Sequence, residues 1–111
     1  MMDHAEALAA KLSHEPVPAE QVVSGQPTTG SVELGSFACR TYGVWEMSPG
    51  AMSDVEVDEL FVVVVVAGAG RVEFADGSAT VELAPGSVGR FDAGTRTVWT
   101  VSETLRKIYL A

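Results

Sequence analysis

The chain has 111 residues, enough for one hydrophobic core and a single domain. Its 7 basic and 15 acidic residues give a formal charge of -8 and a pI near 4.5. This charge repels phosphate backbones and anionic lipid surfaces, so nucleic acids and membranes are excluded as partners. The longest apolar run, Leu60 to Ala67, is too short for the roughly 20 residues of a membrane-spanning helix. With one cysteine and no basic-then-apolar export signal, we expect a cytoplasmic protein.

The first region expected along the chain is a short helix. Between Asp3 and His14, apolar residues recur at helical spacing, with Asp3 as an N-cap and Glu6 three residues later. Pro16 and Pro18 end the helix, and an extended arm follows over residues 17–23. We therefore divide the chain into a helix and arm (1–23) and a β-domain (24–111).

From Ser24 onward, glycine and proline interrupt short runs rich in Val, Thr and aromatic residues. This pattern is typical of an antiparallel sandwich or barrel. Asp76-Gly77 is the clearest hairpin turn. Strands are predicted near 31–39, 41–47, 55–66, 70–75, 79–83, 87–91, 97–102 and 105–110.

Two stretches of the β-domain carry a family likeness. Gly86, Asp92, Gly94 and Thr97 have the spacing of the second cupin motif, in which proline and histidine normally stand where Asp92 and Thr97 stand here. Further similar phrases are Gly43 to Glu46, Ser48 to Gly50, Asp58 to Phe61, Thr97 to Val101 and Thr104 to Tyr109. Residues 20 to 111 thus resemble the cupin superfamily, and within it the ureidoglycine aminohydrolase-like branch. The resemblance implies an all-β, jelly-roll antiparallel barrel that has lost a metal-binding histidine at Thr97.

The first cupin motif lies between Gly50 and Gly70 and allows two registers. In the preferred register, Glu59 occupies the glutamate position of the motif, and Ser53 and Val55 replace its two histidines. The Val62 to Val66 run then implies a bulge or a longer strand. In the rival register, the histidines are replaced by Glu56 and Asp58, and the glutamate by Val63.

Strand alternation favours the preferred register, because it sends the apolar side chains inward and the acidic ones into water. The face predicted to lie inside carries Val55, Val57, Glu59 and Phe61. The face predicted to be solvated carries Asp54, Glu56 and Asp58. Neither register supplies a three-histidine site, so we expect no metal ion and no other cofactor.

The candidate ligand-binding residues of the barrel lumen are Glu59, Phe61, Thr97, Trp99 and Lys107. Burial would raise the pKa of Glu59 unless a cation lies close, and Lys107 is the first candidate partner, followed by Arg96 and Arg90. The equally weighted alternative is that Glu59 ends a strand and reaches solvent. Trp99 shares a strand face with Thr97 and should project inward with it.

Other reactive side chains have simpler interpretations. Trp45 and Glu46 lie on opposite faces of a strand, so only one can face the lumen. His4 and His14 are too far apart on a helix to share a metal and are read as surface residues. Cys39 is read as a small core residue.

The leading functional hypothesis is a metal-independent cupin that binds an unidentified small molecule in its lumen. The alternatives are a divalent-metal enzyme similar to ureidoglycine aminohydrolase and a structural or regulatory dimerisation module. Catalysis is disfavoured because the metal-ligand histidines are absent, and no motif in the sequence indicates a catalytic residue. Because the arm has no evident partner within the domain, we also expect a homodimer.

Overall fold

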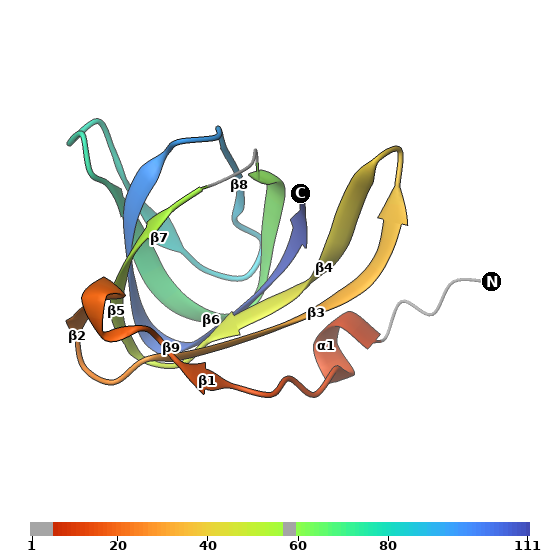
Figure 1. The fold of residues 1–111 in the computed structure, drawn as a ribbon, viewed down its shortest axis with the longest axis horizontal. Helices are drawn as coiled ribbons and strands as arrows, with labels where there is room; N and C mark the ends of the chain where they lie inside the picture. Colours follow the sequence, from red (N-terminus) through yellow and green to blue (C-terminus); the bar gives the residue numbers. More distant parts are fainter. Residues whose placement is uncertain (1–5, 57–59) are drawn as a thin grey trace.

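The computed structural model describes residues 6–56 and 60–111, without the side chains of residues 6–7, 37 and 60–64. Its framework is one antiparallel sheet that curls into a barrel, as Figure 1 shows. The all-β prediction is therefore correct. The main strands are β3 (Thr28–Phe37), β4 (Arg40–Met47), β5 (Gly50–Val55), β6 (Leu60–Phe74), β7 (Thr80–Leu83), β8 (Val88–Phe91) and β9 (Arg96–Leu110).

Strand β9 organises the sheet because it is long enough to bind three other strands. Its first half pairs with β5 and its second half with β4, while the opposite edge pairs with β6 along most of its length. Strands β7 and β8 pair with the free edge of β6, and β3 pairs with β4. The register between β6 and β9 shifts three times between Val65 and Gly70, so the pair bends as it wraps around the core.

Several predicted strand boundaries were wrong. Val55, the first residue of the predicted segment 55–66, belongs to β5. Residues 60–66 of this segment and residues 70–74 of the next one belong to one strand, β6, and the segments 97–102 and 105–110 are both parts of β9. The bulges allow these strands to continue through glycine-rich and polar stretches that resemble turns in the sequence. The hairpin predicted at Asp76-Gly77 is confirmed, since it joins β6 to β7.

The N-terminal region differs from its prediction. In place of a helix from Asp3 to His14, the described residues contain one helical turn, α1 (Glu6–Ala9). The arm is not unpaired, because β1 (Glu15–Pro16) pairs with β3, and β2 (Val22–Ser24), which follows the 3-10 turn η1 (Ala19–Gln21), pairs with β5. Val17 between them belongs to the buried core. The argument for a homodimer from a partnerless arm therefore fails, and the dimer itself stays a prediction.

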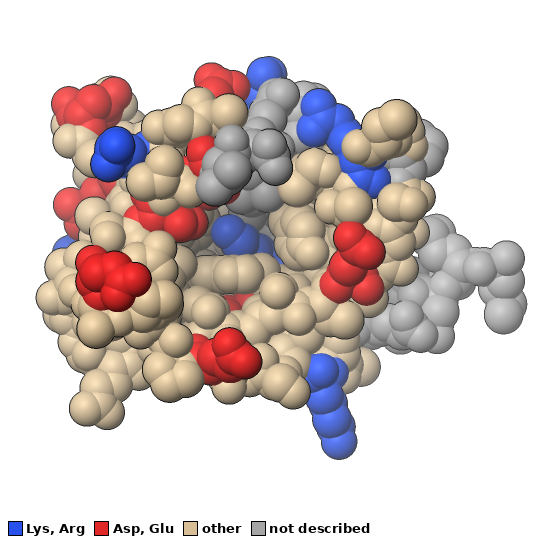
Figure 2. Space-filling model, viewed as in Figure 1, with Lys and Arg blue, Asp and Glu red and all other residues tan. Residues whose placement is uncertain are grey.

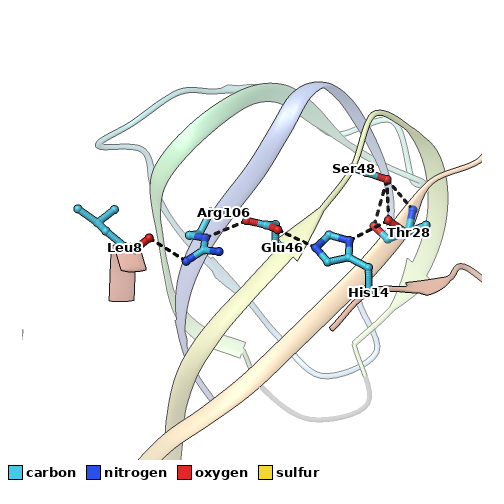
Figure 3. Close-up of polar contacts among 6 residues, drawn as sticks. All are labelled: Leu8, His14, Thr28, Glu46, Ser48 and Arg106. Atoms are coloured by element: carbon cyan, nitrogen blue, oxygen red, sulfur yellow. Dashed lines mark hydrogen bonds and ion pairs between the residues drawn. The ribbon is translucent and has the colours of Figure 1, made fainter. Parts of the chain in front are cut away.

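A polar network ties this N-terminal segment to the outer face of the barrel (Figure 3). The Glu46 carboxylate lies 2.6 Å from His14 Nε2 and accepts a hydrogen bond of 2.9 Å from Arg106 Nε. Arg106 also donates to the Leu8 carbonyl oxygen, and His14 Nδ1 lies 2.8 Å from Thr28 Oγ1. His14 is thus a half-buried link rather than the isolated surface residue that was predicted.

The β3–β4 hairpin turns through Ala38 and Cys39, which have φ angles of 50° and 62°. Two successive positive φ angles are typical of a type I′ turn, the two-residue turn that matches the twist of a hairpin. Cys39 is exposed at this turn, so the prediction of a core cysteine was wrong. The predicted strands 31–39 and 41–47 place the break at residue 40, just after the observed turn at Ala38 and Cys39.

Candidate functional site

The described part of the barrel holds an open cavity of about 230 Å³. Figure 2 shows a hollow in one face of the molecule, with a basic side chain inside it and acidic side chains around it. The lining residues that carry the chemistry are Trp45, Asp54, Glu56, Trp99, Lys107 and Tyr109. They come from β4, β5, β9 and the residue after β5.

Strand pairing explains why these side chains meet. Residues that lie opposite each other in an antiparallel pair project to the same side of the sheet. Trp45 lies opposite Lys107 across β4 and β9. Their neighbours Glu46 and Arg106 therefore form the next cross-strand pair, on the outer face. The lumen face of β4 carries the tryptophan, and the outer face carries the glutamate.

Lys107 is the most unusual residue of the cavity. Its side chain is only 6% exposed, and its ammonium nitrogen lies 4.2 Å from the ring centroid of Trp45 and 4.1 Å from that of Trp99. Both distances fit cation–π interactions, which favour the charged amine. Within the described residues, no hydrogen bond or ion pair to this nitrogen is found. Burial nevertheless dominates and lowers the pKa of Lys107 to about 8, although the charges of Glu56 and Asp54 act in the opposite direction.

Asp54 and Glu56 bring two carboxyl groups into the same cavity. Burial raises the pKa of Asp54, partly opposed by a hydrogen bond from the Val55 amide and by the charge of Lys107. Burial also raises the pKa of Glu56, and the neighbouring charge of Asp54 adds to this effect. The prediction of a fully solvated acidic face was therefore wrong for both residues.

The same geometry contradicts the inward face that was predicted for Val55 in the preferred register of the first cupin motif. Val55, predicted to face inward, is 43% exposed, and the Ser53 hydroxyl donates to the Gln21 carbonyl oxygen of the N-terminal arm. The inward position belongs to Glu56, which replaces a histidine in the rival register. Val57, Asp58 and Glu59 lie outside the described residues, so the proposed pair between Glu59 and Lys107 is not addressed.

The remaining predicted lumen residues have different surroundings. Thr97 and Trp99 are both buried, and the indole Nε1 of Trp99 donates a 2.9 Å hydrogen bond to Thr97 Oγ1. Thr97 thus orients the ring of Trp99 and does not itself line the cavity. The side chain of Phe61 lies outside the described part of the chain. Arg90 and Arg96 are exposed, and Arg90 lies 3.4 Å from Asp92.

A second cavity of about 170 Å³ lies on another side of Trp99. It is lined mainly by apolar side chains of β6, β7 and β8, including Val72, Leu83 and Phe91. The Phe91 ring packs against Trp99 at a centroid distance of 5.6 Å. Trp99 therefore lines both the polar and the apolar cavity, and a change in its rotamer would alter both.

Transition metals in proteins require several histidine, cysteine or carboxylate ligands that converge on one point. Residues 6–56 and 60–111 contain no group of three or more such side chains. In the cavity, the position of a cupin histidine is taken by Thr97, which already accepts a hydrogen bond, and an ammonium group competes for the two carboxylates. The described donor set does not fit a cupin-type metal ion.

A curled antiparallel sheet with a solvent-accessible lumen defines a small barrel of the cupin class. The family model for the EutQ-like cupin domain matches residues 34–109, and the chain belongs to this family. No curated protein sequence matches the chain. In the described residues, no helix is both long and apolar enough to cross a membrane.

Solved structures share the fold at low sequence identity. A DUF861-family protein of unknown function from Pseudomonas syringae is 21% identical, with a TM-score of 0.76 over 91% of this chain and 44% of its own. A putative ethanolamine utilization protein Q from Salmonella typhimurium is 15% identical, with a TM-score of 0.66 over 91% and 94%. Ectoine synthase from P. lautus is 13% identical, with a TM-score of 0.68 over 99% and 75%. The chain spans less than half of the Pseudomonas protein, and these likenesses show the fold alone.

Proposed function

We propose that the protein binds a small, partly apolar molecule in its lumen without a metal ion. One observation carries this proposal: the ammonium group of Lys107 lies over two tryptophan rings at the wall of an open cavity, away from any described hydrogen-bond partner. A buried charge is costly unless something satisfies it. In the open cavity, a ligand that supplies a hydrogen-bond acceptor would take the place of solvent beside this ammonium group.

The charges of the cavity suggest the class of ligand. An acceptor or anionic group of the ligand would bind Lys107, and a donor or cationic group would bind Asp54 or Glu56. The rings of Trp45 and Trp99 would contact the apolar part between these groups. Amino acids and ureides carry both kinds of group and suit a volume of about 230 Å³.

Thermal unfolding in the presence of each compound class, with a chelator added, tests this function. A true ligand at a hundredfold excess over its Kd should raise the free energy of unfolding by about 2.7 kcal/mol. The effect should disappear in Lys107→Met, which removes the charge, and persist in Lys11→Met, which removes the exposed lysine outside the cavity. A panel of these compounds that shifts neither the wild type nor Lys11→Met would contradict the proposal.

Within the cupin superfamily, the resemblance to the ureidoglycine aminohydrolase-like branch would instead imply a divalent-metal enzyme. The described donor set gives this alternative no support, because Asp54 and Glu56 share their cavity with the ammonium of Lys107. Elemental analysis of the purified protein separates the two functions. Stoichiometric manganese or zinc would favour the enzyme and overturn metal-independent binding.

A dimerisation module without a ligand is the remaining alternative. It predicts a lumen filled by side chains, whereas the described residues leave the cavity beside Lys107 open. Light scattering at micromolar concentration tests the homodimer independently of the ligand. A monodisperse monomer would exclude a role in dimerisation and leave the binding proposal intact.

A further inference from the structure

Lys107 has the surroundings of a reactive amine as well as those of a binding group. The sequence contains only two lysines, Lys11 and Lys107, and only the second is buried. Lys107 faces an open cavity, and no described carboxylate lies within ion-pair distance of its nitrogen. The amine can therefore be approached by a molecule in the cavity without first breaking a salt bridge to a described residue.

We infer that Lys107 condenses reversibly with the carbonyl carbon of a small neutral aldehyde, forming a Schiff base inside the lumen. This inference rests on the proposed function only in using the same cavity. It adds a covalent step that non-covalent binding does not require.

Protonation decides whether an amine can attack, because only the neutral form has a free electron pair. The pKa of Lys107 is lowered to about 8, chiefly by burial and against the charges of Glu56 and Asp54. About a tenth of the Lys107 side chains would thus be neutral at pH 7, compared with far below one per cent for a lysine of ordinary pKa. Among the two lysines, the buried one is therefore the better nucleophile at neutral pH.

The condensation balances with the groups present. The ammonium first loses a proton to solvent in the open cavity, and the nitrogen lone pair then forms a bond to the aldehyde carbon. The carbonyl oxygen takes up protons, the carbon–oxygen bond breaks, and water leaves. The product is a protonated imine with the same single positive charge as the starting ammonium. The cation–π contacts with the two tryptophan rings are therefore available to both the starting ammonium and the protonated imine.

Charge favours a neutral aldehyde over an anionic oxo acid. When ionised, Asp54 and Glu56 outweigh the single positive charge of Lys107. They would repel a carboxylate on the incoming carbonyl compound. The third titratable group on the cavity wall, Tyr109, has its pKa raised by burial and by the charge of Glu33, so it is neutral at pH 7 and adds no charge.

Reductive trapping of the wild-type protein tests the inference. The protein is incubated at pH 7 with propanal and sodium cyanoborohydride, which converts a protonated imine into a stable propyl amine. Cleavage after Glu6, Glu15 and Glu103 then places the α-amino group, Lys11 and Lys107 in three different peptides. Mass spectrometry of these peptides gives the propylation rate of each amine, so Lys11 is a control within the same molecule.

We expect Lys107 to be propylated at least about tenfold faster than Lys11 at pH 7, because its lowered pKa leaves about a tenth of its side chains neutral. The rate should rise with pH with a midpoint near pH 8. The preference for Lys107 over Lys11 should be smaller with the anionic pyruvate than with propanal. Propylation of Lys11 at an equal or higher rate would overturn the inference. Because trapping needs no thermal shift, a trapped Lys107 with no non-covalent ligand would refute only the proposed function, and the reverse result would refute only the Schiff base.

Discussion

The substitution Glu46→Gln should weaken the link between the N-terminal segment and the barrel. The Glu46 carboxylate is 17% exposed and contacts two basic side chains, His14 at 2.6 Å and Arg106 at 2.9 Å. Glutamine keeps one acceptor oxygen but loses the charge and places an amide donor against one of these two groups. Hydrogen bonds to charged groups contribute about 1.5–3 kcal/mol, and partial exposure reduces this value. We expect a loss of about 1–2 kcal/mol in the free energy of unfolding.

Urea unfolding at pH 7, followed by tryptophan fluorescence, measures this loss. The matched control is Glu73→Gln, which breaks an ion pair of the same 2.9 Å length to Arg71 on an exposed strand surface. Glu73 is 44% exposed, so its substitution should cost no more than about 0.5 kcal/mol. Equal costs for the two substitutions would refute the argument that burial makes the Glu46 network stabilising.

The pH dependence gives a second check with a defined sign. Burial opposes ionisation of Glu46, but hydrogen bonds from Arg106 and His14 lower its pKa below the ordinary 4.5. A carboxyl group with a lowered folded-state pKa stabilises the protein fully above its unfolded value and loses this effect as pH falls through the folded value. The difference between wild type and Glu46→Gln should therefore be largest above pH 4.5 and shrink below it. A difference that grows in acid would contradict the assignment.

Substitutions at three places in the fold test separate features. Lys107→Met should raise the free energy of unfolding at pH 7 by about 1–3 kcal/mol, because it removes a buried charge. This difference in the free energy of unfolding should shrink as pH rises from about 8 toward 10.5, because Lys107 then becomes neutral in the folded wild type and the buried charge is lost. Gly68→Ala, at φ 91°, should lower the free energy of unfolding by more than about 2 kcal/mol, because its Cβ would collide with the backbone of β9. The control Gly77→Ala, at φ 78° in open space, should lower it by about 1 kcal/mol. Replacing Ala38-Cys39 with Asn-Gly should stabilise the type I′ turn by about 1 kcal/mol.

Chemical denaturation measures all three effects. An unchanged difference between wild type and Lys107→Met across pH 8 to 10.5 would show that the amine has an ordinary pKa. Equal costs at Gly68 and Gly77 would exclude the collision with β9. Destabilisation by Asn-Gly would show that residues 38 and 39 do not form the hairpin turn.

Much of the framework could be predicted from the sequence because it depends on local rules. Glycine and proline punctuation marks most strand ends, and Asp76-Gly77 specifies a hairpin turn through its own backbone preferences. Alternation along β9 also places Thr97 and Trp99 on one face, and the structure buries both. These signals act within a few residues, so no long-range contact is needed to interpret them.

The face of the acidic residues could not be predicted in the same way. Alternation shows that Asp54 and Glu56 share a face, but it does not show whether that face meets solvent or the lumen. The simple rule that charged side chains face solvent predicts that this face is exposed. The tertiary structure instead brings the ammonium of Lys107, about 50 residues later in the chain, to the same cavity and partly offsets the cost of burying the carboxylates.

The His14, Glu46 and Arg106 network has the same explanation. Its members are separated by 32 and 60 residues and meet only because β4 and β9 are neighbours under the N-terminal segment. The sequence by itself determined an all-β chain, its main turns and the alternation of its strands, because these follow from backbone preferences over short distances. Only the tertiary structure decided which charged side chains enter the lumen and which ones hold the N-terminal segment at Leu8 and His14, because strand pairing sets both.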